Sequence, residues 1–161
     1  MGQRIIILAF CLIIFACTPT QTPVPTSTPL LDLDIEMESA FMDARNSLDQ
    51  FIERIQTPHP ARTFAAVKTR FFPPDGLPQD IWVDQVTYLD GSFRGNMGDD
   101  IPSLRLYLGD EIMVKAEDVL DWMVIEDGKL IGGYTIRFAY RRMSPEEKQN
   151  FLESLDYSLD E

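Results

Sequence analysis

The chain has 161 residues, of which 45% are hydrophobic and 25% charged, and its 26 acidic and 14 basic residues give a formal net charge of −12. This length suits one ordinary domain, and the hydrophobic fraction is too high for general disorder. The acidic balance argues against nucleic acid as a partner and against direct binding to an anionic lipid surface, because both favour clustered Lys and Arg.

Residues 1–16 have the pattern of a bacterial signal peptide. Arg4 precedes eleven consecutive apolar residues, from Ile5 to Phe15, and this run is too short to span a bilayer as a permanent helix. The end of the run, Ile14-Phe15-Ala16-Cys17, resembles the lipobox of lipoproteins, so we expect Cys17 to become a lipidated N-terminus and membrane anchor. The alternative is an ordinary secretory signal that happens to end in cysteine. Since Cys11 would leave with the signal, no intrachain disulfide could form.

Residues 17–29 comprise this cysteine and a segment in which four Pro and five Thr occupy twelve positions. Such a segment forms neither a helix nor a central strand, so we expect an extended tether of roughly 35 Å. Loss of residues 1–16 removes one base and no acid, which would leave a net charge of −13 on the exported chain. We expect one folded domain over residues 30–161.

Residues 31–56 favour an amphipathic helix. Apolar residues recur there at spacings of three and four, on one helical stripe: Met37, Phe41, Ala44, Leu48, Phe51 and Ile55. Acidic residues in the first turns match the positive end of the helix dipole, which explains them better than a calcium loop without its glycine. The prolines of Thr57-Pro58-His59-Pro60 end the helix.

Strand-like segments rich in β-branched and aromatic residues follow at 63–72, 81–88, 92–97, 111–115, 122–126 and 129–141. Asp127-Gly128 is typical of a two-residue type I′ hairpin turn, and Leu89-Asp90-Gly91-Ser92 is a second turn. Ser144-Pro145-Glu146-Glu147 is a capping box that begins a short last helix. The order predicts an α+β domain: an N-terminal amphipathic helix packed on a curled, mostly antiparallel sheet of five or six strands, with a short C-terminal helix.

Several short motifs between residues 37 and 155 are typical of one protein family. They are Phe64-Ala65-Ala66-Val67-Lys68, Ile81-Trp82-Val83, Gly109-Asp110-Glu111, Asp121-Trp122-Met123, Asp127-Gly128-Lys129, Gly132-Gly133-Tyr134-Thr135-Ile136-Arg137 and Arg142-Met143-Ser144-Pro145-Glu146-Glu147. Together they resemble the bacterial domain-of-unknown-function family 2314. The resemblance implies a small secreted, lipoprotein or stand-alone bacterial protein, and no established activity. Gln79-Asp80 replaces the family's Glu-His, and Asp99-Asp100-Ile101 replaces its Asn-x-Pro turn, so any role of that histidine does not transfer.

The residue content excludes conventional catalytic triads and zinc-hydrolase sites. His59 is the only histidine and lies between two prolines, where we expect a surface loop. Nucleophile–base pairs and typical zinc sites need convergent His or Cys, so we expect no metal and no cofactor. The 26 acidic residues offer too many carboxylate pairs for any one pair to indicate glycoside hydrolysis.

Two basic residues interrupt strand-like segments. Alternation places Tyr134, Ile136, Phe138 and Tyr140 on one face of the last strand and Arg137 on the other, while Ala66, Lys68, Arg70 and Phe72 share a face of the first. If these strands are neighbours, Lys68 and Arg137 form a small cationic site for a carboxylate or another anion. The alternative, which an acidic domain favours, is internal pairing with Asp110, Asp121 or Glu126.

A second candidate site combines Asp121 and Trp122 with Gly132, Gly133 and Tyr134. Glycines permit close backbone approach, and the aromatic side chains could line a groove for a ligand or peptide. The alternative, which we favour, is a bulge or tight bend with the tryptophan filling the core.

The sequence therefore predicts a membrane-anchored, extracytoplasmic lipoprotein whose domain binds an envelope protein or a small ligand without catalysis. The residues expected to bind are Lys68, Trp82, Asp121, Trp122, Gly132, Gly133, Tyr134 and Arg137. One alternative is an envelope enzyme that uses carboxylates and an arginine. Another is an immunity or inhibitor protein whose acidic surface engages a basic target.

Overall fold

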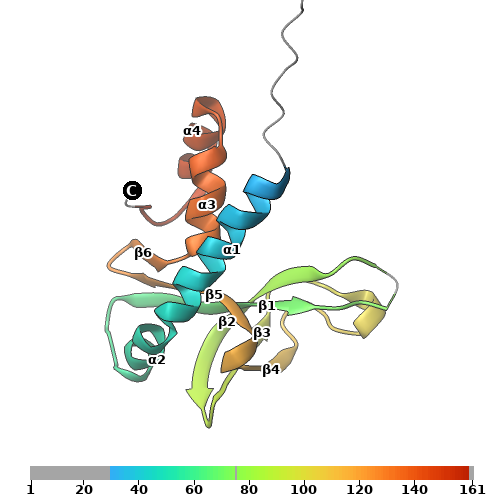
Figure 1. The fold of residues 1–161 in the computed structure, drawn as a ribbon. Helices are drawn as coiled ribbons and strands as arrows, with labels where there is room; N and C mark the ends of the chain where they lie inside the picture. The colour runs from blue at the N-terminus through green and yellow to red at the C-terminus, as the bar shows by residue number, and fades with distance from the viewer. Residues whose placement is uncertain (1–29, 75, 160–161) are drawn as a thin grey trace, which may run out of the picture.

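The computed structural model describes residues 30–74 and 76–159. This part of the chain contains four α-helices and a six-stranded sheet, which confirms the predicted α+β class (Figure 1). The expected signal peptide, lipidated Cys17 and tether lie outside the described residues. Among the helices that are described, none is long and apolar enough to cross a membrane.

The sheet is antiparallel throughout, in the order β4-β3-β2-β1-β5-β6. Its strands are β1 (Arg62–Phe71), β2 (Gln79–Leu89), β3 (Ser92–Met97), β4 (Glu111–Lys115), β5 (Val119–Glu126) and β6 (Lys129–Gly132). Both predicted hairpin turns are confirmed. Asp90 and Gly91 join β2 to β3 and Asp127 and Gly128 join β5 to β6, all with the positive φ that a type I′ turn requires.

The predicted long N-terminal helix is divided into α1 (Leu30–Asn46) and α2 (Leu48–Gln56). Ser47 lies at the break, and its hydroxyl bonds the carbonyl oxygens of Asp43 at 2.7 Å and Ala44 at 3.2 Å. A serine that bonds the preceding turn of its own helix tends to bend that helix. The same hydroxyl lies 2.8 Å from the phenolic oxygen of Tyr134, so a distant tertiary contact fixes the break.

Helices α1 and α2 cover one face of the sheet and enclose the larger core. Phe51 of α2 stacks on Trp122 of β5, with ring centroids 5.1 Å apart, and contacts Phe93 of β3. The indole N–H of Trp122 donates to the carbonyl oxygen of Ala44 at 3.0 Å. Trp122 is therefore buried with its one polar group satisfied, as the structural alternative for this residue predicts.

The opposite face carries a smaller core. Its buried residues are Ala66, Met123, Ile125 and Leu130, and the side chains packed on them include Trp82, Ile136 and Tyr157. The last described residues run along β6, where Ser158 accepts a hydrogen bond from the Leu130 N–H and donates its own N–H to the carbonyl of Gly128. This segment covers the β6 edge of the sheet.

The expected strand over 129–141 is wrong beyond Gly132. Gly132 and Gly133 have φ values of 74° and 64°, and they turn the chain from β6 into helix α3 (Tyr134–Arg142). The alternation from Tyr134 to Tyr140 is therefore not a strand face, because residues two apart lie on different sides of a helix. Helix α4 (Pro145–Ser154) follows, and its predicted capping box between Ser144 and Glu147 is confirmed.

Candidate functional site

Three of the predicted site residues lie in one row across the centre of the sheet. Lys68 on β1 is paired with Trp82 on β2 and with Asp121 on β5. Directly paired residues of antiparallel strands project to the same face. The Lys68 ammonium lies 4.7 Å from the centre of a Trp82 ring, within cation–π distance.

Asp121 is fully buried, and four hydrogen bonds satisfy its carboxylate. Oδ1 accepts from the backbone N–H groups of Trp122 at 2.8 Å and Tyr134 at 3.2 Å. Oδ2 accepts from the backbone N–H of Thr135 at 2.8 Å and from its hydroxyl at 2.7 Å. Burial raises the pKa of Asp121 above its usual range, although these four hydrogen bonds oppose the shift.

Helix α3 begins at this carboxylate. Its N-cap, Gly133, has no side chain to bond the free N–H groups of the first turn, so Asp121 of β5 satisfies two of them instead. The absence of a side chain at Gly132 lets the start of α3 lie close to β5, because a Cβ at this position would come within 2.6 Å of the Trp122 ring. The two glycines are therefore required by the turn and by this close approach.

The Thr135 side chain connects Asp121 to Lys68. Its hydroxyl donates to Asp121 and accepts a 2.8 Å hydrogen bond from Lys68 Nζ. Burial lowers the pKa of Lys68 below the usual lysine value, while the charges of Asp121 and Asp80 oppose that shift. The structure thus supports the predicted internal pairing of Lys68 with Asp121, through the threonine hydroxyl.

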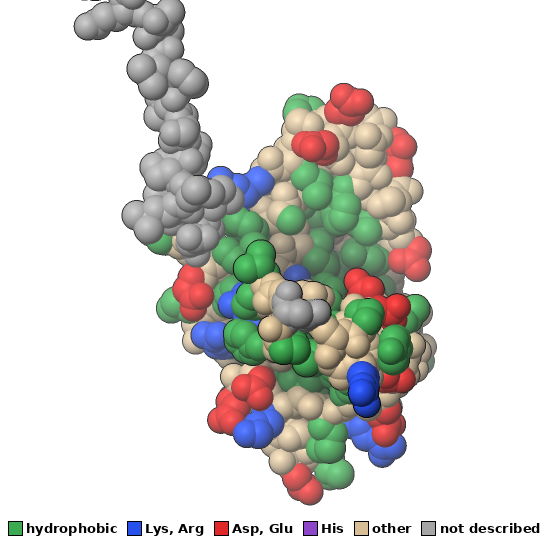
Figure 2. Space-filling model, turned by 90° about the vertical axis from the view of Figure 1, so that its right-hand side faces the viewer, with side chains coloured by type: hydrophobic (Ala, Val, Ile, Leu, Met, Phe, Trp, Pro, Cys, Tyr) green, Lys and Arg blue, Asp and Glu red, His purple; other side chains and the backbone are tan. Residues whose placement is uncertain are grey.

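Beside this ammonium lies a hollow of about 230 Å³, which we call the Lys68 pocket. Its other lining residues are Thr135, Ile136, Ala139, Met143, Phe151 and Tyr157, which come from α3, α4 and the C-terminal segment. Figure 2 views the molecule from the side of the β1–β2 connection. Hydrophobic side chains gather over the middle of this face, and acidic side chains lie mostly toward its outside. The lining of the Lys68 pocket combines one half-buried positive charge with mostly apolar side chains.

The expected cationic site of Lys68 and Arg137 on neighbouring strands is wrong. Arg137 lies on α3, and its guanidinium donates to the carbonyl oxygens of Gly132 at 2.9 Å and Leu130 at 2.8 Å. These bonds hold α3 against the end of β6.

The other acids named as internal partners have separate roles. Glu126 bonds Arg54 and Arg62, at 2.5 and 2.8 Å. Asp110 accepts the backbone N–H of Tyr107 in a loop.

Sequence reasoning placed Lys68, Trp82 and Asp121 in the site but missed Thr135 and the apolar walls. Ile136, Ala139 and Met143 follow one another at spacings of three and four, which is a helical signal. The aromatic alternation over the same residues hid that signal. No local signal indicated the hydrogen bonds of Thr135, because they depend on a carboxylate from the distant strand β5.

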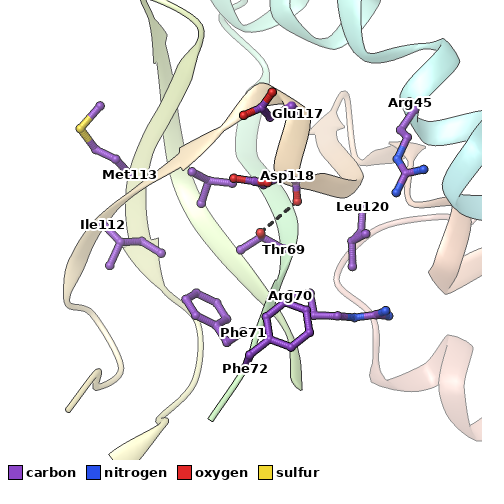
Figure 3. Close-up of a pocket in the computed structure, with 11 residues that line it drawn as sticks. Arg45, Thr69, Arg70, Phe71, Phe72, Ile112, Met113, Glu117, Asp118 and Leu120 are labelled. Carbon is purple, nitrogen blue, oxygen red and sulfur yellow. Dashed lines mark hydrogen bonds between the residues drawn. The ribbon is translucent and has the colours of Figure 1, made fainter. Parts of the chain in front are cut away.

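Further hollows lie elsewhere in the described structure. One, of about 360 Å³, is lined by Glu126, its two arginines and His59. Another, of about 510 Å³, lies between the end of β1, strand β4 and the residues that precede β5 (Figure 3). Over the described residues, no group of three or more His, Cys, Asp or Glu side chains is arranged to hold a metal ion.

Comparison with known proteins gives the family. A model of a family described as "Uncharacterized protein conserved in bacteria (DUF2314)" matches residues 34–158. The chain belongs to this family. The resemblance drawn from the short motifs is thereby confirmed, and the match covers every strand and all four helices in whole or in part.

Two relatives show how far the similarity extends. The uncharacterized protein YegJ of Escherichia coli (strain K12) is 37% identical over 102 residues, which is 62% of this chain and 64% of YegJ. A putative ankyrin repeat protein of Neisseria meningitidis serogroup B is 31% identical over 93 residues, 55% of this chain and 36% of that protein. The chain thus spans less than two thirds of each relative. No solved structure matches it.

In this member of the family, the motifs that carry the resemblance also build the site. Asp121-Trp122-Met123 supplies the buried carboxylate, and Gly132-Gly133-Tyr134-Thr135-Ile136-Arg137 supplies the turn, the threonine relay and one wall of the Lys68 pocket.

Proposed function

We propose that this protein is a lipid-anchored binding module of the bacterial cell envelope. Its domain binds, without catalysis, a ligand that carries an anionic group and a small apolar part. The observation that carries this proposal is the half-buried Lys68 ammonium in the wall of the apolar Lys68 pocket.

The ammonium retains capacity for an anion. A lysine has three N–H donors, and among the described residues the Thr135 hydroxyl takes one of them. A carboxylate or phosphate oxygen entering the pocket would form charge-assisted hydrogen bonds in surroundings partly shielded from water. The walls, such as Ile136 and Met143, would bury the apolar part of the same ligand.

The geometry supports binding over catalysis. The carboxylate of Asp121 is buried under four donors, so it holds α3 in place and has no access to a substrate. The guanidinium of Arg137 is engaged with backbone carbonyls. The groups that an arginine and carboxylate enzyme would use are thus committed to the fold.

The envelope location rests on the sequence pattern at residues 1–29. An export signal that ends in Ile14-Phe15-Ala16-Cys17, followed by a Pro/Thr-rich segment, suits a domain held at a distance from a membrane by a lipid on Cys17. Separation from the membrane surface suits a domain with a strong negative charge, because anionic lipid headgroups would repel it.

Octanoate is a suitable probe of the binding site, because it joins a carboxylate to a short chain. We expect titration calorimetry to detect its binding to the full chain, and Lys68→Met to weaken that binding at least tenfold. The matched control is Lys115→Met, which removes an exposed lysine on β4 and should leave the affinity unchanged. Equal binding by the wild type and Lys68→Met would refute the proposed site.

The anchor has its own test. Cys17→Ser should move the protein from the membrane to the soluble fraction and abolish incorporation of labelled palmitate. Cys11→Ser, inside the apolar run, is the matched control and should change neither result. Membrane retention and unchanged labelling of Cys17→Ser would refute lipidation at this residue.

A further inference from the structure

Strand β4 is an open edge of the sheet. It lies at one end of the strand order, and within the described part of the chain no strand pairs with its outer side. The opposite edge, β6, is covered by the C-terminal segment through Ser158. An open edge presents unpaired N–H and C=O groups that can template pairing with another strand.

The hydrogen-bond pattern shows which groups β4 presents. The Asp110 carbonyl accepts from Met97 of β3, and the Ala116 N–H donates to the carbonyl of Gly91. Because the bonding direction alternates along an antiparallel strand, Ile112 and Val114 also bond toward β3. The backbone groups of the alternate residues, Glu111, Met113 and Lys115, therefore point away from the sheet.

Two residues of opposite charge flank Met113 at equal spacing. Glu111 lies two positions before it and Lys115 two positions after it. If a second β4 pairs antiparallel with the two Met113 residues opposite each other, Glu111 of each copy faces Lys115 of the other. Cross-strand pairs of opposite charge stabilise a sheet, whereas like charges directly opposite destabilise it. Both ends of this pairing are thus complementary.

The same region exposes apolar side chains. Met113 is 70% exposed and Phe72, beyond the end of β1, is 71% exposed. Both border the hollow of about 510 Å³ described above, whose wall includes Ile112 and Val114 of β4 (Figure 3). A strand added to the outer side of β4 would extend this wall and cover the backbone on either side of Met113.

We propose that two copies of this chain associate through β4. The two strands pair antiparallel about a two-fold axis at Met113, and the two six-stranded sheets become one sheet across the dimer. This interface is isologous, since each copy offers the same strand to the other. It is separate from the Lys68 pocket, so ligand binding and self-association can fail independently.

A disulfide trap tests the register. In the full chain with Cys11 and Cys17 changed to serine, purified in mild detergent, Met113→Cys places one thiol from each copy at the axis. Directly opposed residues of antiparallel strands have Cα atoms about 5.5 Å apart, within reach of a disulfide. We expect mild oxidation to convert most of Met113→Cys to a covalent dimer. The control Leu89→Cys, equally exposed on β2, should stay largely monomeric. Equal yields from the two variants would overturn the proposal.

Charge exchange tests the pairing itself. Glu111→Lys sets Lys opposite Lys, Lys115→Glu sets Glu opposite Glu, and each should weaken dimerisation at least tenfold in analytical ultracentrifugation. The double variant restores both pairs and should recover most of the wild-type affinity. Glu111 also pairs with Arg94, and Lys115 with Glu117, within one copy. Recovery in the double variant therefore distinguishes the contact between copies from these internal pairs. A wild-type chain that stays monomeric, or a double variant no better than the single ones, would refute the dimer.

Discussion

The backbone N–H and the hydroxyl of Thr135 both donate to the same carboxylate oxygen of Asp121, at 2.8 and 2.7 Å. The two residues are 14 positions apart and belong to α3 and β5. One acid therefore caps a helix, fixes the hydroxyl that meets Lys68, and anchors a wall of the Lys68 pocket to the sheet.

The first prediction concerns this acid. Asp121→Asn replaces an acceptor oxygen with an NH₂ group that would face the N–H donors of α3. We expect a loss of about 3 kcal/mol in the free energy of unfolding, as for other broken buried charge networks. Urea denaturation measures it. The control Asp118→Asn, on an exposed side chain, should change stability by less than about 0.5 kcal/mol. A similar small change for both variants would contradict the capping role.

The second prediction concerns the charge of Lys68. Burial lowers the pKa of Lys68, and the nearby charge of Asp121 limits that shift. NMR of ¹³C-methylated lysines should thus show Lys68 titrating below the usual lysine value of 10.5, and lower still in Asp121→Asn.

The same shift links the stability of the fold to pH. Between the folded and unfolded pKa values of Lys68 the unfolded chain binds more protons, so this residue makes stability rise with pH across that window. Saturating octanoate should raise the Lys68 pKa, because an anion favours the charged amine. No change with octanoate would contradict direct contact.

The third prediction concerns Gly132. Gly132 and Gly91 both have positive φ values, 74° and 80°, but only Gly132 approaches another group, the Trp122 ring. Gly91→Ala should therefore cost only the backbone term of about 1 kcal/mol. Gly132→Ala should cost about 3 kcal/mol, because the ring or the helix must also move. Thermal unfolding of both variants measures the difference. Equal losses of stability in the two variants would show that the close approach of Gly132 to Trp122 makes no difference to stability.

The fourth prediction concerns acid stability. Burial raises the pKa of Glu126, but hydrogen bonds and charges from Arg62 and Arg54 outweigh it and hold the pKa below the usual glutamate value. The ionised carboxylate thus stabilises the fold above the unfolded pKa of about 4.5, and this contribution is lost as pH falls through the lower folded value.

The variant Glu126→Gln should lose about 3 kcal/mol at pH 7, and the difference from wild type should shrink on acidification. Urea titrations at several pH values measure it. Glu53→Gln changes an exposed acid beside the same hollow and should have little effect at any pH. A difference independent of pH would show that the charge of Glu126 is not responsible.

Much of the fold was predictable because its signals are local. The helical stripe through Phe41 and Phe51, the two turns with glycine at positive φ, and the capping box at Ser144 each depend on residues a few positions apart. The sequence also placed Lys68, Trp82 and Asp121 among the site residues. It did not show that β1 lies between β2 and β5, which brings the three into one row.

Helix α3 shows where local signals were insufficient. Tyr134, Phe138 and Tyr140 favour a strand by residue type, and Gly133 offers no side chain to start a helix. The N-terminal donors of α3 are instead satisfied by Asp121, which precedes the helix by more than ten residues. An acceptor supplied across the fold cannot be read from the segment it caps.

The sequence alone determined the family, the α+β class and the expectation of an exported, lipid-bearing chain, because composition, periodicity and short motifs are properties of neighbouring residues. Only the tertiary structure decided that Lys68 meets Asp121 through Thr135, that Arg137 holds α3 to β6, and that β4 is left as an open edge. These relationships depend on strand order and on a turn at Gly132 and Gly133, where segments distant in sequence come into contact.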